Sequence, residues 1–225
     1  AYSFTVTETK TGGEGYTNDT APRTVTVAPS YDAATGRLTV TTTVARDGVE
    51  VARGEVSTAD DATVPPAPVT VAFQNSYEAT GALGGEGDVA IDATKTLTGR
   101  AAAAGEFSFS VRDARGNVVS TASNRVSGDG EAAELAFSPI AYTTGALEQM
   151  VADGTATRID DGFWSISYTV SEDTAALPKG VTATASSFDI TVQATDNGKG
   201  GLDVAVVYPE DSDGKLSFVN GYSAG

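Results

Sequence analysis

Apolar and polar residues alternate over many short segments of the chain, which is the pattern of half-buried β-strands. Seven such segments stand out: residues 24–27, 37–44, 69–71, 106–111, 165–170, 188–192 and 202–207. Turn-forming pairs such as Asp47-Gly48 and Asp129-Gly130 separate them. A single helical turn is predicted at residues 146–151, where apolar residues recur at helical spacing. The pattern predicts an all-β protein.

An internal repeat divides the chain. The segment YSFTVTE (2–8) matches SYTVSE (167–172), residues 23–40 match 188–204, and VAFQNSY (71–77) matches LSFVNGY (216–222). A glycine-rich stretch separates the two copies and is predicted to be a flexible linker. We therefore expect the C-terminal half of a β-sandwich domain at 1–79, a linker at 80–87 and a complete β-sandwich domain at 88–225.

Composition removes several classes of function. The 225 residues include no histidine and no cysteine, which excludes catalytic triads that need either residue, thiolate-bound zinc and disulfides. The net charge of −16, from 14 basic and 30 acidic residues, disfavours nucleic acid and anionic membranes as partners. No stretch approaches 18 consecutive apolar residues, so we expect no membrane insertion of this segment.

Three polar side chains break the apolar pattern. Lys95, Glu172 and Asn220 each fall on the apolar face of the alternating segment that contains them, and Glu8 and Asn75 repeat the last two in the first copy. Taken singly, each residue could lie at a strand end or in a turn with its polar group in water. Their common phase instead predicts a lysine, a glutamate and an asparagine that meet inside one core.

Such a trio has a known chemical consequence. Burial disfavours charge, so a buried lysine tends to become a neutral nucleophile and a buried carboxyl tends to hold a proton. Lys95 Nζ could then attack Asn220 Cγ and expel ammonia, with Glu172 as proton shuttle. Proximity within the fold can supply about 7–11 kcal/mol of the barrier. No cofactor and no metal is required.

Four motifs carry a resemblance to a known family. They are KTLTGR (95–100), FSFSVRDARGNVV (107–119), YTVSE (168–172) and FVNGY (218–222). In this order they resemble the isopeptide-linkage domains of Gram-positive pilins and related surface proteins, over residues 88–223 and, in half-domain form, 2–77. The resemblance implies tandem Ig-like β-sandwiches, a cross-link between Lys95 and Asn220, and Glu172 as the catalytic acid.

The first copy departs from this pattern. Glu8 and Asn75 are expected to be the counterparts of Glu172 and Asn220, but no lysine strand precedes Glu8, and Lys10 belongs to the wrong strand. We therefore expect the first domain to be incomplete at its N-terminus and Asn75 to carry no isopeptide bond within this chain. We also expect residues 1–79 to be less stable than 88–223 because part of their core lacks a cover.

The resemblance implies a mechanical function rather than an enzymatic one. We expect a stalk or pilin-like module of a bacterial adhesin or pilus, extracellular and anchored to the cell wall of a Gram-positive bacterium. Its expected partners are neighbouring domains or subunits of the same fibre. VVYPED (206–211) resembles a pilin polymerisation motif, but Glu210 stands where that motif has lysine.

Two other functions stay open at this point. The first is an adhesin domain that binds a host protein or glycan through a loop at 125–134 or 142–161. The second is an accessory domain of a secreted carbohydrate-active enzyme. Acidic turns at residues 196–198 and 211–214 could also hold calcium, but hairpin turns explain them better, and we expect no metal.

Overall fold

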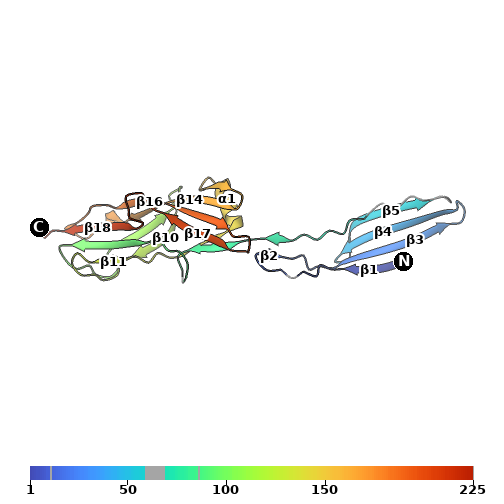
Figure 1. The fold of residues 1–225 in the computed structure, drawn as a ribbon, viewed down its shortest axis with the longest axis horizontal. Helices are drawn as coiled ribbons and strands as arrows, with labels where there is room; N and C mark the ends of the chain where they lie inside the picture. The colour runs from blue at the N-terminus through green and yellow to red at the C-terminus, as the bar shows by residue number, and fades with distance from the viewer. Residues whose placement is uncertain (11, 59–68, 86, 225) are drawn as a thin grey trace. The chain divides into compact units, whose positions relative to one another are not determined.

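A computed structural model describes residues 1–10, 12–58, 69–85 and 87–224. About half of the chain, 53%, is β-strand, and one short α-helix occurs among the described residues, which confirms the predicted all-β class. The chain divides into two compact units, Ala1–Tyr77 and Glu78–Gly225 (unit 1 and unit 2; Figure 1). No helix in the described ranges is long and apolar enough to cross a membrane.

Unit 2 contains a large antiparallel sheet. Its strands, in spatial order, are β10 (Val118–Ser123), β9 (Ser108–Arg112), β14 (Phe163–Glu172), β16 (Ser187–Asp196) and β17 (Leu202–Val207), and β13 (Ala156–Asp160) also pairs with β14. Along β14 the buried residues alternate with less buried ones, as expected for a strand with one face on the core. Glu172 ends this buried row, in phase with Tyr168 and Val170.

A second sheet of unit 2 brings the ends of the domain together. Its strands, in spatial order, are β11 (Ala132–Glu134), β8 (Ala93–Thr98), β18 (Leu216–Tyr222) and β15 (Val181–Ala183). Strands β8 and β18 run parallel, although more than 100 residues separate them in the sequence. A short pair, β7 (Thr80–Leu83) with β12 (Ile140–Thr143), completes the pairing of this unit.

The core of unit 2 lies between the two larger sheets. Phe218 of β18 packs against Phe109 of β9 and Phe188 of β16, with both ring-centroid distances at 5.0 Å. Helix α1 (Thr144–Ala152) follows β12 and buries Leu147, which places a helix over the turn predicted at 146–151. A 3-10 turn (Thr174–Ala176) follows β14.

Unit 1 is a single sheet with a short ribbon. The sheet runs in the order β1 (Tyr2–Val6), β3 (Arg23–Asp32), β4 (Arg37–Arg46) and β5 (Val49–Thr58), and the ribbon pairs β2 (Tyr16–Thr17) with β6 (Ser76–Tyr77; Figure 1). Val44 is the one buried apolar side chain among the described residues of this unit. Phe4 of β1, which aligns with the buried Tyr168 of unit 2, is 57% exposed, because no second sheet covers β1 within the described part of unit 1.

The expected linker at 80–87 is wrong for its first half. Thr80–Leu83 forms strand β7, which pairs with β12, and Leu83 is buried. Gly81 serves close packing here, since a Cβ at this position would lie 2.6 Å from the carbonyl oxygen of Leu202. The boundary between the units accordingly falls between Tyr77 and Glu78.

The strand expected at 69–71 is also absent. In the repeated segment 71–77, only the last two residues form a strand, β6. Its counterpart in unit 2, β18, is a strand throughout 216–222 and pairs with β8 along its length. A β-strand requires a partner strand with which it forms backbone hydrogen bonds. The described residues of unit 1 include no equivalent of β8, so residues 71–75 have no such partner there.

Candidate isopeptide site

Three strands bring Lys95, Glu172 and Asn220 together. Lys95 lies in the middle of β8, opposite Phe218 of β18, and Asn220 follows two residues later on β18. Glu172 is the last residue of β14 in the other sheet, where it is paired with Phe109. The three side chains therefore approach one another from both walls of the sandwich.

Lys95, Glu172 and Asn220 are in direct contact and buried. Lys95 Nζ lies 2.6 Å from Glu172 Oε1, and Asn220 Nδ2 donates a hydrogen bond of 2.9 Å to the same oxygen. The residues are 1%, 5% and 0% exposed for Lys95, Glu172 and Asn220. One carboxylate oxygen thus contacts both the candidate nucleophile and the nitrogen that would leave.

The surroundings disfavour a charged lysine. Burial lowers the pKa of Lys95, and the hydrogen bond to Glu172 only partly opposes that effect. The ring centroids of Phe107 and Phe109 lie 4.4 Å and 5.9 Å from Nζ, so aromatic faces stand where water would otherwise solvate the amine. A lowered pKa increases the fraction of lysine that is present as the free amine, which is the nucleophilic form.

Two polar atoms of the site lack partners. Glu172 Oε2 and Asn220 Oδ1 are buried and accept no hydrogen bond from the described residues. A buried acceptor without a donor costs about 1–3 kcal/mol, and such atoms are rare in folded proteins. The unlinked cluster therefore carries a cost in stability at these two atoms.

Comparison with known protein families agrees with this geometry. Residues 91–223 match the family model described as Spy0128-like isopeptide-containing domain (FctA). The chain belongs to this family. No curated protein matches the chain. Membership identifies unit 2 as a pilin-like structural domain, in line with its β-sandwich fold and with the buried Lys95, Glu172 and Asn220.

Within its described residues, unit 1 brings together Glu8 and Asn75, the counterparts of Glu172 and Asn220, without a lysine. Asn75 Nδ2 donates to Glu8 Oε1 at 2.9 Å, the same contact that Asn220 makes with Glu172. Asn75 is exposed, however, and Asn18 donates a second hydrogen bond of 2.7 Å to Glu8 Oε1. Of the described contacts to Glu8, none comes from a lysine.

Sequence reasoning missed a buried ion pair in unit 1. Arg23 and Asp19 are both buried and paired with each other, and the Arg23 guanidinium lies 4.7 Å from the ring centroid of Phe73. The hydrogen bond from Arg23 lowers the pKa of Asp19. The internal repeat indicates that Arg23 is buried, because Arg23 aligns with Phe188, and the ring of Phe188 packs on Phe218 in the core of unit 2.

The acidic turns behave as turns. Asp196 Oδ1 accepts a hydrogen bond from the backbone N–H of Gly198 at 2.8 Å, and Asn197 Oδ1 accepts one from Lys199 at 2.9 Å. Asp213 adopts a positive φ of 51° just before Gly214, in the turn between β17 and β18. These two strands lie in different sheets, so the hairpin expected at residues 211–214 is wrong, whereas the turn at 196–198 joins the paired strands β16 and β17. The side chains of Asp196 and Asn197 thus cap the backbone of their own turn.

Proposed function

We propose that unit 2 is a structural module of a bacterial surface fibre, stapled by an amide bond between Lys95 and Asn220 that the domain forms by itself. The observation that carries the proposal is the position of Glu172 Oε1, which lies 2.6 Å from the lysine nitrogen and 2.9 Å from the asparagine amide nitrogen. Family membership of residues 91–223 supports it independently.

The reaction begins with a proton transfer. The Lys95 ammonium gives a proton to Glu172 Oε1 across their hydrogen bond, which leaves a neutral amine and a protonated carboxyl. Both products are uncharged, so the buried apolar setting favours this step. The free amine is then the nucleophile for the neighbouring Asn220.

Attack and elimination complete the bond. Nζ bonds to Asn220 Cγ, a proton moves by way of the carboxyl from Nζ to Nδ2, and the Cγ–Nδ2 bond breaks. The products are a secondary amide, one ammonia molecule and Glu172 with its acquired proton, so atoms and charge balance. Each domain undergoes the reaction once, and it is therefore self-modification and not turnover.

The bond would change how the domain carries force. Lys95 lies in β8, near the start of unit 2 in the sequence, and Asn220 lies in β18, near its end. The two strands are neighbours in space. Tension applied at the two ends of the unit would pass from residue 95 to residue 220 through the amide, and the chain between them would be bypassed. A module of a fibre that is pulled requires such a path.

An intact-mass measurement tests the proposal. The purified chain should weigh about 17 Da less than its sequence, the mass of one ammonia, and a digest should contain a branched peptide that joins Lys95 to Asn220. Lys95→Arg, which keeps a positive charge but cannot form this amide, should restore the full mass. Full mass in folded wild-type protein would refute the cross-link.

A further inference from the structure

The strands of unit 1 repeat half of unit 2. In unit 2, β14 pairs with β16 and β16 with β17, and in unit 1, β1 pairs with β3 and β3 with β4. The register agrees as well, because Phe4 faces Val25 as Tyr168 faces Ile190. The ribbon formed by β2 and β6 likewise repeats the pairing of β15 with the end of β18.

Unit 2 shows what the repeat lacks. In unit 2, β18 lies between β15 and β8, and β14 lies between β16 and β9. Within the described residues of unit 1, no strand pairs with segment 71–75, and β1 is the last strand of its sheet. β1 presents aromatic residues at this edge, with Tyr2 66% exposed and Phe4 57% exposed. Such an edge is a template for another strand.

Half of an isopeptide site lies at this open position. Glu8 Oε1 accepts from Asn75 Nδ2 at 2.9 Å, and Glu8 Oε2 is buried without a partner among the described residues. A cavity of about 470 Å³ opens beside them, lined in part by Tyr16 and Asn18. Asn75 is exposed here, whereas Asn220 is covered by its neighbours in unit 2.

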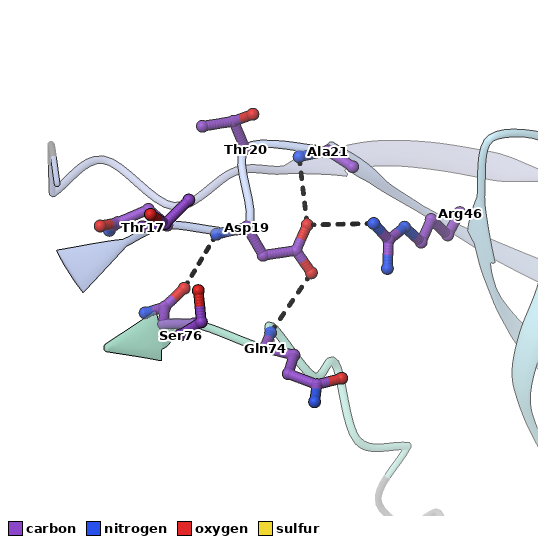
Figure 2. A pocket seen from close by; sticks show the side chains of 9 residues that line it. Thr17, Asp19, Thr20, Ala21, Arg46, Gln74 and Ser76 are labelled. Carbon is purple, nitrogen blue, oxygen red and sulfur yellow. Dashed lines mark hydrogen bonds and ion pairs between the residues drawn. The ribbon is translucent and has the colours of Figure 1, made fainter. Parts of the chain in front are cut away.

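The carbonyl of Asn75 is already held for attack. The backbone N–H of Asp19 donates to Asn75 Oδ1 at 2.9 Å, the oxygen that would become negative when an amine adds to Cγ. Figure 2 shows how Asp19 is itself fixed: its carboxylate accepts from the backbone N–H groups of Ala21 and Gln74 and pairs with Arg46. The electrophile of the half site is thus preorganised.

We propose that unit 1 is an acceptor for a lysine-bearing β-strand from outside residues 1–225. The strand would run parallel to segment 71–77 as β8 runs parallel to β18, with its lysine opposite Phe73, the equivalent of Phe218. Apolar residues two places before and after the lysine would fill the open side, as Ala93 and Leu97 do in β8.

The bond would form by the same balanced steps. The incoming lysine gives a proton to Glu8, its Nζ bonds to Asn75 Cγ, and ammonia leaves with Nδ2. The product is an amide between two polypeptide segments, which would link unit 1 covalently to its donor. Lys10, the one lysine within residues 1–77, also lines the cavity, and the experiment below distinguishes it from the donor.

A donor peptide tests the proposal. The probe is a synthetic copy of residues 88–113 of this chain, which carries the sequences of β8 and β9, mixed with the full 225-residue protein. We expect a covalent adduct whose mass is the sum of both components less about 17 Da, with the new branch point mapped to Asn75. Glu50, which is exposed on β5 and does not line this cavity, provides a matched control, and Glu50→Gln should still form the adduct.

Three variants make the result decisive. The adduct should be lost with Asn75→Ala, with Glu8→Gln and with a peptide in which arginine replaces the lysine. Absence of adduct with the wild-type pair, an adduct at another residue, or a bond between Lys10 and Asn75 in the protein alone would each overturn the proposal. The Lys95–Asn220 bond is measured separately by the mass of the unmixed protein, so the two proposals can fail independently.

Discussion

Lys95 and Asn220 lie on the same face of two neighbouring parallel strands, offset by two residues along the ladder. Side chains two residues apart on a strand point the same way, so this offset directs both toward the opposite sheet. Glu172 meets them from that sheet, with one oxygen in contact with both nitrogens. One sheet thus holds the proposed reacting pair, and the opposite sheet holds the proposed proton shuttle in contact with both.

Replacing the shared oxygen should stop the reaction. In Glu172→Gln the side-chain amide cannot take the lysine proton, so we expect folded protein with the full sequence mass and no branched peptide. Glu134→Gln is the matched control, because Glu134 is exposed on β11 beside β8 and should leave the bond intact. Formation of the bond at the wild-type rate in Glu172→Gln would show that proximity alone is sufficient.

Loss of the cross-link should lower the stability of unit 2. Asn220→Ala removes the electrophile but keeps the buried contact between Lys95 and Glu172. The amide closes a loop of roughly 125 residues, which by analogy with a disulfide stabilises the fold by about 5 kcal/mol. Denaturant unfolding should reveal this difference, whereas Asn117→Ala, in an exposed turn, should cost far less. Equal unfolding midpoints for Asn220→Ala and wild type would contradict a cross-linked native state.

The unlinked domain should gain stability as the pH rises. In Asn220→Ala, burial holds the pKa of Lys95 below its ordinary value of 10.5, so between the folded and unfolded values the unfolded chain binds more protons. The free energy of unfolding should therefore increase with pH across that window, up to about 10.5. Wild type should lack this contribution because an amide nitrogen does not titrate.

A double variant isolates this effect from other groups that titrate at high pH. Asn220→Ala combined with Lys95→Met removes the lysine, and the difference between its pH profile and that of Asn220→Ala belongs to Lys95. A difference that is flat with pH, or that falls as pH rises, would contradict the lowered pKa. Urea unfolding at several pH values between 7 and about 11 supplies both profiles.

A buried pair of tyrosines should behave as a unit. The hydroxyl groups of Tyr142 and Tyr168 lie 3.0 Å apart, both side chains are buried, and burial raises both pKa values. Either single change to Phe leaves one hydroxyl without this partner and should cost about 1–3 kcal/mol. The double change should cost less than the sum, as measured by a denaturation cycle. Strict additivity would show that the hydroxyl contact contributes nothing.

Unit 1 should unfold before unit 2. Its described residues bury one apolar side chain, Val44, together with the pair of Asp19 and Arg23, whereas unit 2 has a continuous apolar core and the proposed cross-link. Hydrogen exchange should therefore be faster across β3 and β4 than across β14 and β16. The donor peptide proposed above should slow exchange in β1, and equal protection of both units without it would contradict the half-domain interpretation.

Much of this protein follows from its sequence by a single physical rule. Alternation assigns each strand an inner and an outer face, and on that basis Lys95, Glu172 and Asn220 were predicted to point into one core, where the structure finds them buried. The absence of histidine and cysteine limited the available chemistry, and the repeat identified Glu8 and Asn75 as the equivalent pair.

Tertiary structure decided which strands are neighbours. The alternation of apolar and polar residues does not show which strands pair. It therefore could not predict that β8 and β18 are parallel neighbours, or that one oxygen of Glu172 contacts the side-chain nitrogens of both Lys95 and Asn220. It also misread Gly81 as part of a linker, because close packing against Leu202 and chain flexibility both select glycine. Burial of Arg23 depends on Asp19 and Phe73, and contacts between residues distant in sequence exist only once the chain has folded.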